Sequence, residues 1–125
     1  MNIYKILIVA LGGSLGSIVR YIGVKTIDNH FNSQFPAGTF SVNIIGSFII
    51  GIVYAIVARK TGSDNWALFI GTGFCGGFTT FSAFAFENIS LINQRLAMTS
   101  VLYIVSSVAL GLLAVVAGMA LGRNV

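Results

Sequence analysis

The chain has 125 residues, of which 56% are hydrophobic and only 8% charged, and its formal net charge is +4. An ordinary soluble domain carries about 25% charged residues, and a chain this short has too much surface to hide so much apolar material from water. The basic residues are scattered between apolar stretches, which is typical of anchoring at lipid headgroups and excludes a nucleic-acid-binding arm. We therefore interpret residues 1–125 as a single transmembrane domain surrounded by a lipid bilayer.

Four stretches are long and apolar enough to span a bilayer as helices, which takes roughly 20 residues each. They run over about residues 3–23, 38–58, 66–92 and 97–121, and the polar stretches Lys25–Gln34, Arg59–Asn65 and Asn93–Arg95 separate them. Helix is the expected conformation because an open sheet edge cannot be satisfied in lipid. The expected fold is an all-α membrane protein of four transmembrane helices with antiparallel neighbours.

Small residues four positions apart recur in three of these spans. The pairs are Gly12 with Gly16, Ser47 with Gly51, and Gly118 with Gly122. In lipid, such pairs let helix backbones approach closely. They predict a tight bundle and say nothing of a substrate.

The second span contains Asn43 close to its beginning. Polar groups inside a bilayer are costly and usually functional. The Asn43 amide can donate two hydrogen bonds to an anion. Alternatively, it pairs with the backbone of another helix.

The third span contains an unusual run of glycines, Gly71, Gly73, Gly76 and Gly77, followed by Thr79 and Thr80. Glycine and β-branched threonine both disfavour a helix. We expect the third helix to be broken in mid-membrane, and non-helical backbone survives at that depth only where protein buries it or where it lines a cavity. Alternatively, the glycines only permit close packing.

Two polar or aromatic stripes could serve an ion. Phe78, Phe81 and Phe84 recur at three-residue spacing, and the positive edges of their rings could touch a small anion; packing is the alternative. Tyr103 and Ser107, four apart on the fourth span, either line a wet path or bond to a neighbouring helix.

Glu87 is the only acidic residue within a span. It could couple transport to protons, could be neutral or bonded to a helix backbone, or could lie at the membrane interface. Coupling would suit the alternative function, a small proton-coupled four-helix multidrug-type exporter, but that class depends on an acid in the first span, which has none. A non-transporting assembly subunit is a third class. The chain has no phosphate-binding loop and no His-Glu-x-x-His motif, so we do not expect an enzyme.

The basic residues barely distinguish the two sides of the membrane. One side would carry Lys5, Arg59, Lys60 and Arg123, and the other Arg20, Lys25 and Arg95. Orientation follows Lys/Arg asymmetry, so this four-to-three split favours insertion both ways round and pairing of opposite copies. Alternatively, other factors fix one orientation.

Three motifs together resemble the Fluc (CrcB) family of fluoride ion channels. They are Gly12-Gly13-Ser14-Leu15-Gly16 followed by Arg20-Tyr21, then Gly38-Thr39 followed by Val42-Asn43 and Gly46, then the string from Gly73 to Phe84 followed by Glu87. The resemblance covers essentially the whole chain. Gly111 and Val115 offer no hydroxyl where the family continues a polar track, and Ala83 stands where a hydroxyl residue is frequent.

The resemblance implies an antiparallel dual-topology homodimer in the plasma (inner) membrane, with passive pores that export cytoplasmic fluoride. The residues assigned to the ion pathway are Asn43, Thr80, Phe81, Ser82, Phe84, Tyr103 and Ser107, with Arg20 in a vestibule. A structural Na⁺ ion at the dimer interface would bind the backbone carbonyls of Gly76 and Thr79. Alternatively, the Thr79 and Thr80 hydroxyls bond to the freed carbonyls and the break needs no ion.

Overall fold

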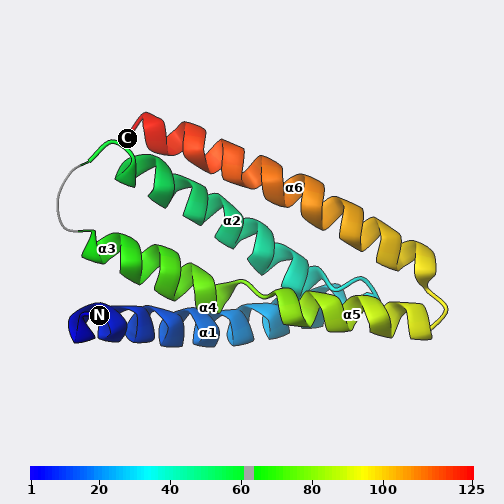
Figure 1. The fold of residues 1–125 in the computed structure, drawn as a ribbon. Helices are drawn as coiled ribbons and strands as arrows, with labels where there is room; N and C mark the ends of the chain where they lie inside the picture. The colour runs from blue at the N-terminus through cyan, green and yellow to red at the C-terminus, as the bar shows by residue number, and fades with distance from the viewer. Residues whose placement is uncertain (61–63) are drawn as a thin grey trace.

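The computed structural model describes residues 1–60 and 64–125, and this part of the chain is helical apart from short connections. Figure 1 shows the order of the elements. They are α1 (Ile3–Phe31), α2 (Ala37–Val57), α3 (Asn65–Ala67), the π-helix η1 (Leu68–Cys75), α4 (Gly76–Phe78), α5 (Phe81–Asn93) and α6 (Ala97–Arg123). Four stretches, Ile3–Phe31, Ala37–Val57, Asn65–Asn93 and Ala97–Arg123, are long and apolar enough to cross a membrane. The predicted all-α architecture with four long apolar helices is confirmed.

The first helix is longer than the expected span of residues 3–23. It continues to Phe31, so most of Lys25–Gln34, which we expected to be a break, is helical. Polar residues alone do not end a helix, and this stretch contains neither glycine nor proline. The helix ends where Asn32 adopts a left-handed conformation (φ 44°) and its N–H bonds to the Asp28 carbonyl. The expected break at Arg59–Asn65 lies partly outside the described residues.

The helices form two packed pairs (Figure 1): α2 lies along α6, and α1 lies along η1 and α4. The two termini and the C-terminal end of α2 lie at the same end of the molecule. There the Arg59 Nη2 donates hydrogen bonds to the carbonyls of Gly122 (2.8 Å) and Val125 (2.6 Å). This arrangement follows the up-and-down order of four spans.

The small residues at four-residue spacing mark the closest contacts between helices. A Cβ atom at Gly16 would meet the Phe74 carbonyl oxygen of η1, and one at Gly118 would meet the Phe48 carbonyl oxygen of α2. Real Cβ atoms do not come this close to a backbone oxygen, so both positions require glycine. The tight bundle that these pairs predict is present.

The third span is interrupted, as its glycines and threonines predict. Thr79 (ψ 158°) and Thr80 (φ −150°) have extended backbone between α4 and α5. The π-helical stretch Leu68–Cys75 that precedes the interruption was not predicted. Such stretches are rare and often occur at functional sites.

Candidate functional site

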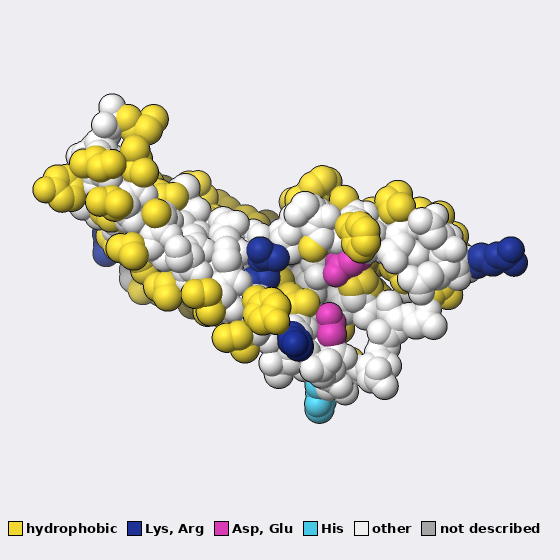
Figure 2. All heavy atoms as spheres, turned by 90° about the horizontal axis from the view of Figure 1, so that it is seen from below, with side chains coloured by type: hydrophobic (Ala, Val, Ile, Leu, Met, Phe, Trp, Pro, Cys, Tyr) yellow, Lys and Arg dark blue, Asp and Glu magenta, His cyan; other side chains and the backbone are white. Residues whose placement is uncertain are grey.

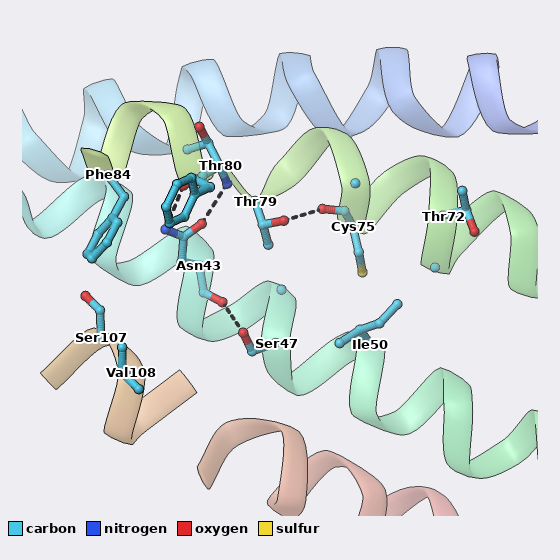
Figure 3. A pocket seen from close by; sticks show the side chains of 14 residues that line it. Asn43, Ser47, Ile50, Thr72, Cys75, Thr79, Thr80, Phe84, Ser107 and Val108 are labelled. Atoms are coloured by element: carbon cyan, nitrogen blue, oxygen red, sulfur yellow. Dashed lines mark hydrogen bonds between the residues drawn. The ribbon is translucent and has the colours of Figure 1, made fainter. Parts of the chain in front are cut away.

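A cavity of about 490 Å³ lies beside the interruption of the third span (Figure 3). It is bordered by α2, η1, α4, the interruption, α5 and α6. The lining residues are Asn43, Gly46, Ser47, Ile50, Gly71, Thr72, Cys75, Gly76, Thr79, Thr80, Phe81, Phe84, Ser107 and Val108. Most residues singled out by the sequence thus surround one space, although they come from three different spans.

Not every expected site residue borders this cavity. Asn43, Thr80, Phe81, Phe84, Ser107, Gly76 and Thr79 do, whereas Ser82, Tyr103 and Arg20 do not. Ser82 is exposed, and its hydroxyl lies 3.3 Å from that of Thr80. Ser47, Thr72 and Cys75 also line the cavity. The sequence indicates a packing role for Ser47 and no site role for any of the three.

The Asn43 side chain is bonded to the interruption itself. Its Oδ1 accepts a hydrogen bond from the Thr80 N–H (2.8 Å), and its Nδ2 donates to the Thr80 carbonyl (3.1 Å), as Figure 3 shows. One amide N–H of Asn43 remains after this pairing. Asn43 therefore pairs with the backbone of another span, as the alternative predicts. This pairing uses one of its two amide N–H groups and does not use the other.

The interruption redirects the hydrogen bonds that a continuous helix would form. In an α-helix the Thr80 N–H would bond to the Gly76 carbonyl and the Ala83 N–H to the Thr79 carbonyl. Here the Thr80 N–H bonds to Asn43, and the Ala83 N–H bonds to the Thr80 Oγ1 (3.1 Å), which caps α5. The carbonyls of Gly76 and Thr79 thereby lose their regular helical donors.

The threonine hydroxyls do not replace those donors. The Thr79 Oγ1 donates to the Cys75 carbonyl (2.8 Å), which also accepts the Thr79 N–H (2.9 Å). The Thr80 hydroxyl serves as the cap of α5. Neither of these bonds goes to the carbonyl of Gly76 or Thr79.

The aromatic rings form a connected row beside the cavity. Phe84 packs against Phe81 (centroids 5.9 Å apart) and edge-to-face against Tyr103 (5.0 Å), and Phe35 packs edge-to-face on the other side of Tyr103 (5.2 Å). Phe81 is 78% exposed on the surface of the chain. Phe81 thus lines the cavity, while most of its side chain is exposed on the surface of the single chain.

Tyr103 is completely buried, and its hydroxyl links two helices instead of lining the cavity. It donates to the Glu87 Oε1 (2.8 Å), while the Thr39 Oγ1 donates to the Glu87 Oε2 (2.7 Å). Of the alternatives for Tyr103, bonding to a neighbouring helix therefore holds. Glu87 is bonded to side chains and not to a helix backbone, and it also lines a second cavity of about 250 Å³. Thr39 joins this cluster through a contact that the sequence alone could not reveal.

Ser107 is the one buried side-chain oxygen or nitrogen without a hydrogen-bond partner within residues 1–60 and 64–125. Its hydroxyl points towards the cavity from α6, opposite Asn43 and Phe84 (Figure 3). A buried hydroxyl without a partner costs free energy unless a ligand or water satisfies it. It therefore marks the polar wall of the cavity.

Arg20 of α1 does not line the cavity and contacts the backbone of α4 just before the interruption. Its Nε donates to the Gly77 carbonyl (2.9 Å), which would otherwise accept from the first turn of α5. Seen from the side of α1, acidic and basic side chains lie near the middle of a face that combines hydrophobic side chains with uncharged surface (Figure 2). The Arg20 guanidinium thus satisfies the Gly77 carbonyl, one of the carbonyls that the interruption leaves without a helical donor.

Comparison with known proteins agrees with the motif resemblance. A family model for CrcB-like proteins (Camphor Resistance, CrcB) matches residues 7–119. The fluoride-specific ion channel FluC of Gloeothece citriformis is 43% identical over 120 residues, which cover 96% of this chain and 98% of the relative. The proteins of the same name from Agrobacterium fabrum (44% over 122 residues, 96% and 97%) and Paracoccus denitrificans (45% over 116 residues, 93% and 92%) are similarly close. This chain belongs to the CrcB (FluC) family.

Proposed function

We propose that this chain forms a passive fluoride channel through which cytoplasmic fluoride leaves the cell across the plasma membrane. Membership of a family whose relatives are named as fluoride-specific channels supports this function. The structural observation that carries it is the cavity beside the interruption, which joins Asn43, Phe81, Phe84 and the unpartnered Ser107. The same names favour a channel over the multidrug-type exporter and over an enzyme.

The chemistry of the cavity suits a small, strongly hydrated anion. A dry pathway must replace water's hydrogen bonds, and the remaining Asn43 N–H, the Ser107 hydroxyl and the ring edges of Phe81 and Phe84 are all suitable donors. None of the residues that line the cavity is Lys or Arg. Binding would be weak enough for the ion to leave, as conduction requires. The membrane potential, about 2.3 kcal/mol per charge per 100 mV, would drive the anion out.

A second copy of the chain is needed to cover the interruption. Gly76 and Phe81 are exposed on the single chain, next to carbonyls that have lost their helical donors. Lipid cannot satisfy such groups at membrane depth, so they must line a cavity or be covered by protein, and a second copy would shield their exposed side from lipid. We propose an antiparallel homodimer because the four-to-three division of basic residues gives little instruction for orientation.

The interruption also fits a structural sodium ion. Sodium is a hard cation that prefers oxygen ligands, and the carbonyls of Gly76 and Thr79 border the cavity without their regular helical donors. A Cβ atom at Gly76 would meet nothing within 4 Å, so the single chain is open on the side of this residue that a Cβ would occupy. Two antiparallel copies would contribute four carbonyl oxygens around a two-fold axis. The ion would supply a fixed positive charge at the interface.

Membrane orientation tests the antiparallel arrangement. A tag on the N-terminus should be accessible from both sides of the membrane in cells that express this gene alone. Two additional lysines beside Arg59 should force one orientation, because they break the balance of basic residues. A tag found on one side only in the unaltered protein would exclude dual insertion.

Fluoride efflux from liposomes that contain only this protein tests the function. A channel releases fluoride without a proton gradient when an ionophore balances the charge. An exporter requires the gradient, and an assembly subunit gives no efflux under either condition. Efflux that appears only with a proton gradient would overturn the channel in favour of the exporter.

A further inference from the structure

We infer that Asn43 is a positioning residue that keeps the third span open, so that the Gly76 carbonyl remains available to a cation. This inference rests on the proposed sodium site and assigns to Asn43 a role separate from donating to an anion. The Asn43 side chain would then serve both the cation site and the anion pathway.

The first step is a competition for a single N–H group. The Thr80 N–H can bond either to the Gly76 carbonyl, as in a continuous helix, or to the Asn43 Oδ1, as it does at 2.8 Å. The preceding N–H, that of Thr79, still makes its regular bond to Cys75 (2.9 Å). The α-helical hydrogen bonding therefore continues as far as the Thr79 N–H, and the next donor, the Thr80 N–H, is the one that Asn43 diverts.

The second step is the two-sided pairing of the amide with the chain. Asn43 accepts from the Thr80 N–H and also donates to the Thr80 carbonyl (3.1 Å), as a neighbouring strand would. A side chain that could only accept, or only donate, would satisfy half of this extended residue. The amide therefore stabilises the extended conformation of Thr80 and the opening of the helix together.

The third step is the anchorage of Asn43 on a continuous helix. Asn43 lies on α2, and the Ser47 hydroxyl donates to its carbonyl one turn later (2.7 Å). A Cβ atom at Gly46 would collide with the Thr79 methyl group, so glycine lets α2 lie directly against the interruption. The amide is thus held in place by a scaffold that the interruption itself does not disturb.

Removing the Asn43 amide should allow one helical hydrogen bond to form across the interruption. Without Asn43 the Thr80 N–H would turn back to the Gly76 carbonyl, and sodium would then have to displace that bond. One net backbone hydrogen bond in each copy corresponds to a loss of roughly tenfold in sodium affinity. Thr79 would keep its carbonyl exposed, because its helical donor is captured by Thr80 and not by Asn43.

The test measures the rise in Tm of the purified full-length protein as sodium chloride replaces the N-methylglucamine salt. A ligand that binds only the folded protein raises Tm, and at a given concentration it raises Tm more the tighter it binds. The variants are Asn43→Leu, which keeps the volume but neither hydrogen bond, and Asn43→Asp, which keeps the acceptor for the Thr80 N–H. Ser106→Ala is the matched control, since it removes a hydroxyl that bonds back to the Leu102 carbonyl of its own helix (2.6 Å) and takes no part in the pairing of Asn43 with Thr80.

We expect the wild type, Asn43→Asp and Ser106→Ala to show the sodium-dependent rise and Asn43→Leu to lose it, with a sodium midpoint at least about tenfold higher. A rise in Asn43→Leu equal to that of the wild type would overturn the inference and leave the sodium site standing. No rise in the wild type would remove the sodium site and the inference with it. If Asn43→Leu yields no folded protein, Asn43→Asp decides, because loss of its sodium response would contradict the role of the acceptor.

Discussion

The third span and α6 are both apolar enough to cross a membrane, yet they differ in how they use their backbones. The helix α6 runs without interruption from Ala97 to Arg123, and its Ser106 hydroxyl simply donates back to the Leu102 carbonyl. The third span changes from π-helix to α-helix, opens at Thr79 and Thr80, and begins a new helix at Phe81. Only the third span leaves backbone groups for other partners in its middle, away from the helix ends.

The difference shows what an opening inside a membrane requires. Each unsatisfied backbone group in lipid costs several kcal/mol, so the groups freed by the opening need other partners. Arg20 of α1 bonds to the Gly77 carbonyl, Asn43 of α2 bonds to both backbone groups of Thr80, and Thr80 itself caps α5. Continuous helices thus act as the scaffold, and their polar side chains hold the interrupted span open.

The largest effects are expected from substituting two glycines, one in the scaffold of continuous helices and one in the interrupted span. Gly118→Leu should prevent folding, because its side chain would collide with the Phe48 backbone where α6 packs on α2; we expect a cost above about 3 kcal/mol. Gly76→Leu should leave a folded chain, because the space beside Gly76 is open, but should abolish pairing and fluoride efflux. Size-exclusion chromatography, circular dichroism and efflux measure these outcomes. Folded Gly118→Leu protein, or full efflux from Gly76→Leu, would contradict the distinction.

The aromatic row of the interrupted span should control efflux without controlling folding. Phe81→Ile or Phe84→Ile should lower the fluoride efflux rate about tenfold or more, a barrier increase of about 1.4 kcal/mol, because an aliphatic side chain has no positive edge. Phe86→Ile is the control, since Phe86 is 75% exposed on the same helix and does not line the larger cavity. Wild-type rates in both the Phe81 and Phe84 variants would remove these rings from the pathway.

Much of this contrast could be predicted from the sequence, because it depends on local composition. Four apolar stretches predict the helices, and the glycines followed by Thr79 and Thr80 predict the opening. The helix α1 continues to Phe31, beyond the predicted span of residues 3–23, because the polar residues after Gly23 include no helix breaker. The pairing of Tyr103 with Glu87 and of Asn43 with Thr80 joins residues far apart in the chain, so the sequence could name these residues but not their partners.

Arg20 tests whether the scaffold holds the opening by a hydrogen bond or attracts anions by its charge. Arg20→Leu should lower the free energy of unfolding by about 1.5–3 kcal/mol, because the Gly77 carbonyl loses a charged donor. Arg20→Gln keeps a donor without the charge and should lose less stability. A vestibule role would instead slow efflux in both variants at low salt and leave stability unchanged, which denaturant or thermal unfolding in detergent would reveal.

The smallest effect on sodium binding is expected from a substitution at Thr79 that removes only a methyl group and leaves the backbone carbonyl in place. Thr79→Ser keeps the hydroxyl that bonds to the Cys75 carbonyl and should preserve the sodium-dependent rise in Tm within about twofold. Backbone ligands do not depend on the missing methyl group. Loss of the sodium response in this variant would mean that the Thr79 side chain, and not its carbonyl, forms the site.

A high-resolution structure of the protein in sodium chloride tests the central claim most directly, namely that the interruption exposes the carbonyls of Gly76 and Thr79 for a shared cation. We predict two antiparallel copies with four carbonyl oxygens at roughly 2.2–2.5 Å from one density peak on the two-fold axis, by comparison with other hard-cation sites. Parallel copies, carbonyls turned away from the axis, or a Thr80 N–H bonded to Gly76 with no density between the copies would contradict it.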